Sequence, residues 1–205
     1  MSSRGKISHW LTDRYPADQI RNMHSLTIGH SALLTDVATC LNWYRLASPG
    51  LYCCVHVAIE LSERDTVTPG IVLMVNHGRL KNASPEPEYE IFRGSPNFIT
   101  DVFSSDTDVE YQNRKRLFAD AKVSEYLAIF DTDPLTWHWH SADVSDYGLL
   151  SADDDGVLRS KALPGLWVPE AAFSTRDWWA IMASITRGVT RRGHHELMES
   201  IWNAG

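Results

Sequence analysis

The sequence lacks several features that would assign it to a large class of proteins. None of its apolar runs approaches the ~18 residues that a membrane-spanning helix needs, and residues 1–16 contain no apolar signal segment. Its three cysteines, Cys40, Cys53 and Cys54, form no CxxC pair and no disulfide pattern. We therefore expect a cytoplasmic protein with reduced cysteines and no membrane partner.

An excess of positive charge is also absent. The 19 Lys and Arg residues are outnumbered by 26 Asp and Glu residues, which gives a net charge of −7. Such a chain is not expected to coat nucleic acid non-specifically, although a local basic patch and a DNA substrate remain compatible with this total. The basic run Arg187, Arg191 and Arg192 is interpreted as a solvated helix junction.

The composition is that of an ordinary globular protein with alternating strands and helices. A length of 205 residues with 43% hydrophobic and 22% charged residues predicts one domain with terminal extensions.

The sequence also predicts local features. Ser31 is the expected N-cap of the first helix, and residues 77–95 are expected to form a loop. Trp178 or Trp179 is expected to be buried. Apolar periodicity predicts helices at 31–46 and 109–122, strands at 51–61, 70–76, 97–104 and 125–131 in one sheet, meander strands within 135–162, and two helices over 175–203 split by Gly193.

One acidic residue interrupts the strand predicted at 97–104. Asp101 lies in the stretch "PNFITDVFSS", among apolar residues of β-branched or aromatic type. Burying a carboxylate without a partner costs several kcal/mol, so Asp101 must either bind a cation or pair with a basic side chain. The helix that follows carries two basic candidates, Arg114 and Lys115.

Histidines form the other candidate sites. In "HWH", His138 and His140 alternate onto one face of a strand and could bind zinc together, but the sequence offers no evident third ligand. We expect this pair to face solvent while Trp137 and Trp139 pack inward. The remaining histidines are interpreted as structural: His30 and His56 as hydrogen-bonded core or cap residues, and His194-His195-Glu196 as the polar start of the last helix.

Four stretches carry a resemblance to a known family. They are "VTPGIVLMV", "GSPNFITDVFS", "NRKRLFADAKVSEYLAIFD" and "GVLRSKALPGLWVPEAAF". In order and spacing they resemble the Uma-type "putative restriction endonuclease" family of the PD-(D/E)XK nuclease superfamily. The resemblance implies an α/β (α+β) fold of the restriction-endonuclease-like type, a mixed sheet flanked by helices, over 24–173. Residues 1–23 would be an N-terminal extension and residues 174–205 a C-terminal helical extension.

The resemblance also implies a metal-dependent chemistry on DNA. Acids on neighbouring strands of this family hold Mg²⁺ or Mn²⁺, hard cations that prefer oxygen ligands. Asp101 would be one metal ligand, and Lys115 or Arg114 would act on the scissile phosphate. Glu60 on the preceding strand is the candidate for a second metal ligand.

The departures from the family pattern leave two functions open. Gly70 stands where the first metal-binding aspartate is expected, and Asn97 replaces the aspartate of the second "PD". One reading is an endonuclease whose degenerate site binds Mg²⁺ or Mn²⁺ weakly or no longer; an Asp at position 70 would then restore part of the binding if the strand tolerates it. The alternative is an inactive family member that binds nucleic acid or a protein partner, with a homodimer as one such arrangement, and in which Asp101 is a structural ion pair with Lys115 or Arg114.

Overall fold

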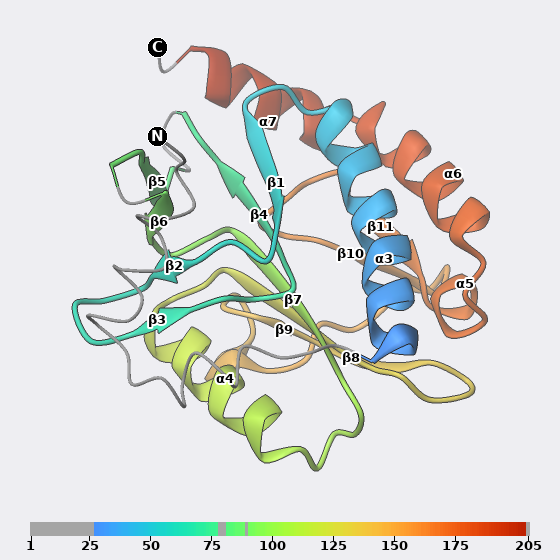
Figure 1. The fold of residues 1–205 in the computed structure, drawn as a ribbon. Helices are drawn as coiled ribbons and strands as arrows, with labels where there is room; N and C mark the ends of the chain where they lie inside the picture. Colours follow the sequence, from blue (N-terminus) through green and yellow to red (C-terminus); the bar gives the residue numbers. More distant parts are fainter. Residues whose placement is uncertain (1–26, 78–80, 89, 204–205) are drawn as a thin grey trace.

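A five-stranded mixed sheet forms the centre of the protein (Figure 1). The computed structural model describes residues 27–77, 81–88 and 90–203, so the extension expected over 1–23 lies outside the described residues. Strands β7 and β8 are parallel and the other neighbours are antiparallel. In spatial order the strands are β1 (Leu51–Val55), β4 (Ile71–Val75), β7 (Phe98–Phe103), β8 (Glu125–Phe130) and β9 (Thr136–Ser141).

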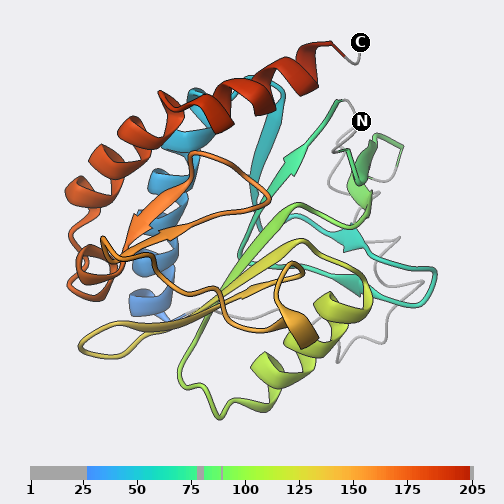
Figure 2. The same cartoon turned by 180° about the vertical axis from the view of Figure 1, so that it is seen from behind.

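Helices cover both faces of this sheet. Helices α3 (Ile28–Leu46) and α6 (Trp178–Val189) lie on one face and α4 (Val109–Asp120) lies on the other, as the two opposite views show (Figures 1 and 2). The restriction-endonuclease-like arrangement expected from the sequence is thus present. The predicted cap of α3 is wrong: the hydroxyl of Thr27 accepts the His30 N–H at 3.2 Å, and Ser31 lies inside the helix.

A second sheet replaces parts of the predicted strand 51–61 and loop 77–95. The chain leaves β1 at His56, whose left-handed φ of 50° ends the strand, and His56 is exposed rather than buried. The residues that follow pair elsewhere, and the expected loop contains a hairpin. This sheet has the order β3 (Thr66–Val67), β2 (Ile59–Glu60), β6 (Ile91–Gly94) and β5 (Ala83–Glu86).

The meander predicted within 135–162 is only partly present. Strand β9 is confirmed, and β10 (Val157–Arg159) pairs with β11 (Trp167–Pro169). Residues 147–151 are not a strand, because a 3-10 turn at Ser145–Tyr147 leaves a single bridge from Leu149 to His140. The loop after β10 is held by Glu125, whose buried carboxylate accepts hydrogen bonds from the Lys161 and Ala162 N–H groups and from two side chains.

The C-terminal helices pack against the main core. After α5 (Glu170–Ser174), α6 lies on α3 and β11, and α7 (Arg192–Trp202) follows a break at 190–191 rather than at Gly193. Trp178 is half-buried against Phe173, with ring centroids 6.0 Å apart, while Trp179 is 81% exposed. Within the part of the chain described above, no helix is long and apolar enough to cross a bilayer.

Candidate functional site

Asp101 lies in the middle of β7 with both carboxylate oxygens hydrogen-bonded. The residue is 6% exposed and faces α4. Oδ1 accepts the backbone N–H of Gly70 at 2.7 Å, because Gly70 immediately precedes β4, which is the antiparallel neighbour of β7. Oδ2 accepts Nη1 of Arg114 at 3.0 Å. The acid that interrupts an apolar strand is therefore buried as one half of an ion pair.

Arg114 reaches Asp101 from the first half of α4. Its guanidinium also contacts Oε1 of Glu110, one helical turn earlier, with Nε and Nη2 each at 3.0 Å. Burial by itself lowers the pKa of Arg114, but the charges of Asp101 and Glu110 more than offset this and raise it above the ordinary value. The guanidinium is permanently charged at this site.

Gly70 has no space for a side chain. A Cβ atom built there would lie 2.8 Å from Cδ1 of Leu34 and 2.9 Å from the backbone oxygen of Thr100. The backbone oxygen belongs to the neighbouring strand and cannot rotate away. The packing around position 70 therefore leaves no room for the aspartate that the family pattern has there.

The other predicted site residues, Glu60 and Lys115, interact with further groups. Glu60 is in β2 of the second sheet, where its carboxylate pairs with Arg93 at 3.4 Å. Lys115 lies near enough to His138 and His140 for its charge to lower their pKa values. In the described segments, no three His, Cys, Asp or Glu side chains are grouped so that they could hold a metal ion.

The "HWH" histidines face α4 and not solvent, so the predicted exposure is wrong. Nδ1 of His138 and Nε2 of His140 lie 2.8 and 3.0 Å from the hydroxyl of Tyr111 on α4. Burial and, to a lesser degree, Lys115 lower the pKa of His140 to about 4, so its ring is neutral at pH 7. Nδ1 of His140 donates to the Tyr147 carbonyl at 2.9 Å, and Nε2 must therefore accept from Tyr111.

This pair shares a face with Asp101 without reaching it. Asp101, Ala128 and His138 are in register across β7, β8 and β9. Two inter-strand spacings separate Asp101 from His138 by about 9–10 Å. The Tyr111 hydroxyl lies where a metal bridging the two imidazoles would be, so the pair is an interior hydrogen-bond network.

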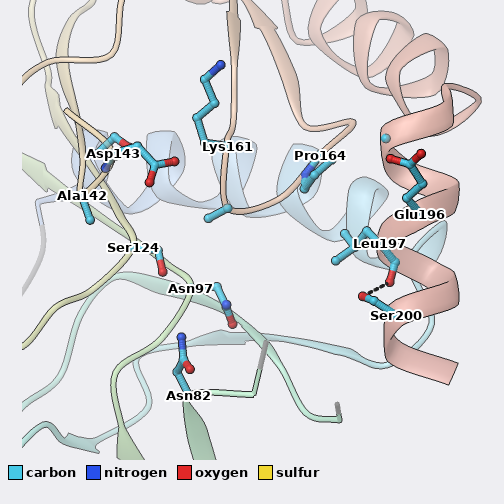
Figure 3. Close-up of a pocket in the computed structure, with 13 residues that line it drawn as sticks. Asn82, Asn97, Ser124, Ala142, Asp143, Lys161, Pro164, Glu196, Leu197 and Ser200 are labelled. Carbon is cyan, nitrogen blue, oxygen red and sulfur yellow. Dashed lines mark hydrogen bonds between the residues drawn. The ribbon is translucent and has the colours of Figure 1, made fainter. Parts of the chain in front are cut away.

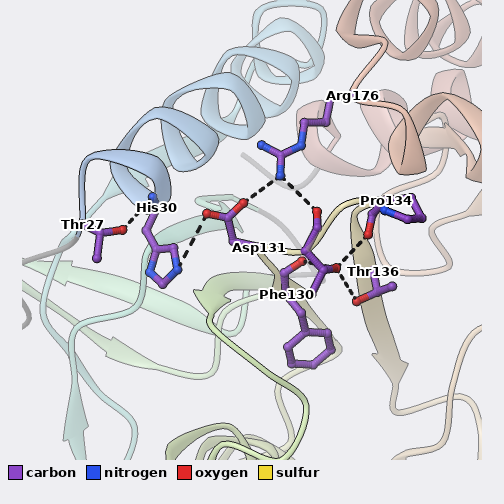
Figure 4. A network of polar contacts seen from close by, with 8 residues as sticks. Thr27, His30, Phe130, Asp131, Pro134, Thr136 and Arg176 are labelled. Atoms are coloured by element: carbon purple, nitrogen blue, oxygen red, sulfur yellow. Dashed lines mark hydrogen bonds and ion pairs between the residues drawn. The ribbon is translucent and has the colours of Figure 1, made fainter.

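A second polar network lies at the C-terminal end of β8. Asp131 follows this strand and contacts Nη2 of Arg176 at 2.7 Å and Nε2 of His30 at 3.8 Å (Figure 4). The same arginine donates to the Thr132 carbonyl at 3.2 Å. The network ties the start of α3, the end of β8 and the segment after α5 together, which supports a structural role for His30.

A pocket of about 420 Å³ with both polar and apolar lining residues opens at the opposite end of the sheet, where β7 begins (Figure 3). Its wall includes Asn97 and Ser124, which directly precede β7 and β8. Lys161 from the loop after β10 and Ser200 from α7 also line it. Asn97 occupies the aspartate position of the second "PD" motif, and its Oδ1 accepts a hydrogen bond from the Val75 N–H at 2.8 Å. Four residues of strand, about 13 Å, separate Asn97 from Asp101, so this pocket is distinct from the acidic site.

These features define a restriction-endonuclease-like protein in which Asp101 is a buried acid in the middle of the central strand. Residues 14–174 match the Uma2 family, described as "Putative restriction endonuclease". Since this match covers most of the chain, the protein belongs to that family. No functionally curated protein matches the sequence.

A solved structure supports the fold independently. The chain is similar to a putative nuclease belonging to DUF820 from Anabaena variabilis, with a TM-score of 0.51 and 11% sequence identity. The similarity covers 77% of this chain and 83% of that one. At this level of identity the likeness concerns the fold alone.

The divalent metal that the family generally uses does not fit the residues found here. Mg²⁺ normally binds through one or two carboxylates that have oxygen lone pairs directed at it. Asp101 directs one oxygen at a backbone N–H and the other at a guanidinium, and no side chain fits at position 70. Arg114 would also repel a second cation at this distance.

Proposed function

We propose that this chain is a nuclease-fold protein that binds DNA and whose metal-dependent cleavage is weak or lost. The observation that carries this proposal is the pairing of both Asp101 oxygens, one with the Gly70 N–H and one with Arg114. DNA as the ligand follows from the family. A cytoplasmic location and a homodimer belong to the same proposal, and the homodimer is testable by light scattering on the purified chain.

The second candidate is an active metal-dependent endonuclease. It is favoured by the retention of Asp101 and by the half-buried Lys115, which lies one residue from Arg114 on α4. A substrate phosphate near Lys115 would in that case have to displace Arg114 from Asp101. Asp101, Lys115 and Arg114 would then be the catalytic set, with Glu60 as the additional acid to test.

A plasmid-nicking assay with Mg²⁺ or Mn²⁺ separates the two functions. We expect the wild type to cleave no faster than Asp101→Ala or than a chain with EDTA, while both proteins retard DNA in a salt-dependent manner. Asp155→Ala, at an exposed position, is the matched control. Wild-type cleavage that disappears in Asp101→Ala but not in Asp155→Ala would establish the second candidate instead.

A further inference from the structure

Two carboxylates from different elements converge on the guanidinium of Arg114. Asp101 approaches Nη1 from β7, and Glu110 approaches Nε and Nη2 from α4. The side chains of Arg114 and Asp101 are 14% and 8% exposed, so the pairing is largely shielded from water. The local charge of the three side chains is −1, which leaves the acids in excess over the single cation.

A buried hydroxyl without a well-formed hydrogen bond lies beside these groups. Tyr126 is fully buried, and in the described part of the chain its hydroxyl has no hydrogen-bond partner of ordinary geometry. Burial raises the pKa of Tyr126, the charge of Asp101 and a hydrogen bond to its carboxylate raise it further, and the charge of Arg114 opposes this. The hydroxyl therefore lies within electrostatic reach of the ion pair. A buried hydroxyl without a well-formed hydrogen bond is costly, and this one is an additional oxygen at the site.

We infer that Asp101 and Glu110 form a cation-binding site that the chain fills with its own Arg114 guanidinium. The inference deepens the proposed function, because it explains the weak or absent metal dependence by internal occupation of the site. The tethered guanidinium has a high effective concentration, so a free divalent ion competes with it poorly. Without the guanidinium, the buried Asp101 and the partly exposed Glu110 would face a space beside the Tyr126 hydroxyl, and their repulsion would favour binding of a small cation.

Shortening residue 114 tests this inference. In Arg114→Ala, titration with Mn²⁺ followed by electron paramagnetic resonance should show one site that binds at least tenfold more tightly than any site of the wild type. The thermal midpoint should rise on addition of Mn²⁺ or of millimolar ethylguanidinium, a free analogue of the missing side chain. Ethylguanidinium should also displace Mn²⁺, because both ions would occupy the same space.

Matched variants make the result specific. Arg116→Ala, an exposed arginine on the same helix, should behave as the wild type, and Arg114→Ala with Asp101→Asn should lose the Mn²⁺ site. Equal Mn²⁺ binding by Arg114→Ala and the wild type, or binding that survives Asp101→Asn, would overturn the inference. If Arg114→Ala does not fold, Arg114→Gln is tested in the same way, and failure of ethylguanidinium to stabilise that variant counts against the inference.

The test is independent of cleavage. A wild type that nicks DNA through Asp101 would contradict the proposed function, whereas the Mn²⁺ and ethylguanidinium titrations of Arg114→Ala would still decide whether the acids form a cation site. Conversely, an inactive wild type together with an Arg114→Ala variant that binds neither ion would leave the proposed function standing and refute the inference.

Discussion

At the residue scale, Asp101 and Arg114 each have a further partner besides each other. Asp101 keeps the Gly70 N–H when Arg114 is removed, and Arg114 keeps the partly exposed Glu110 when Asp101 is removed. Asp101→Ala should nevertheless destabilise the protein by about 2–3 kcal/mol, because a mostly buried guanidinium loses its buried partner and a backbone donor loses its acceptor. Urea denaturation of the purified variant measures this loss.

Glu110→Ala is the comparison for this prediction. The Glu110 side chain is 38% exposed, so its pairing with Arg114 is screened by water and should contribute only about 0.5 kcal/mol. A loss in Asp101→Ala no larger than that in Glu110→Ala would show that the buried pair is not the stabilising element described here.

His140 gives the protein a stability that depends on pH. Its pKa of about 4 in the folded chain lies below the model-peptide value of 6.5, so the unfolded chain takes up a proton first as the pH falls. The contribution is complete above about pH 6.5 and decreases between there and pH 4. It should be on the order of 3 kcal/mol, the free-energy equivalent of this shift for a residue that is 2% exposed.

Urea midpoints between pH 7.5 and pH 4.5 test this prediction. The decrease should be smaller in His140→Gln, which has no proton to take up, although that variant starts from a lower stability. His195→Gln, at an exposed position of α7, should retain the wild-type decrease. Parallel pH profiles for wild type and His140→Gln would rule out His140 as the titrating group.

The sequence predicted part of this chemistry. An acid within an apolar strand and two cations on the next helix indicated either a metal ligand or an ion pair, and the contacts of Asp101 are those of the ion pair with Arg114. Glu110 was missed, although its spacing of four residues from Arg114 is a signal for such a contact. The orientation of His138 and His140 was wrong because strand alternation shows which residues share a face but not which face a helix covers.

At the scale of elements, long apolar strands were predicted well and short irregular ones were not. β4 and β8 are buried on both sides, so their continuous apolar runs identify them. β2, β3, β5 and β6 have two to four residues each and depend on pairing with distant segments. Nothing in the local sequence at His56 indicates the left-handed turn that ends β1, after which Ile59 and Glu60 pair with β3 and β6.

Gly70 shows how tightly β4 approaches its neighbours. Gly70→Ala should destabilise the protein by about 2 kcal/mol or more, because the new Cβ overlaps the Thr100 backbone oxygen and Leu34. Gly70→Asp should be worse, and the recovery of metal binding expected for it from the sequence is not supported by this packing. Thermal unfolding measures the stability of both variants.

Gly193→Ala, where the nearest atom to a Cβ is 3.6 Å away, is the control and should be neutral or stabilising. A well-folded Gly70→Asp that binds Mn²⁺ would contradict this account.

At the scale of the whole molecule, the family match and the hydrophobic core end at different places. The match stops at residue 174, whereas α6 and α7 contribute side chains to the same core as α3 and the main sheet. Tyr44 on α3 further links to the loop before β11 through a 3.0 Å hydrogen bond from its hydroxyl to the Pro164 carbonyl. We therefore expect the two C-terminal helices to complete the domain, in contrast to the separate extension predicted over 174–205.

Removal of these helices should prevent stable folding. Ile181, Ile185, Leu197 and Ile201 are each at most 4% exposed, and burial of one such side chain contributes about 1.5–3 kcal/mol. Their sum is comparable to the total stability of a domain, about 5–15 kcal/mol. A chain ending at residue 174 should thus be insoluble or show a broad, non-cooperative thermal transition by circular dichroism.

Trp179→Ala, which removes an exposed side chain from α6, is the control and should unfold as cooperatively as the wild type. A soluble 1–174 fragment with a sharp transition near the wild-type midpoint would instead show that the helices are a separable extension, because the sheet, α3 and α4 would then bury enough apolar surface by themselves.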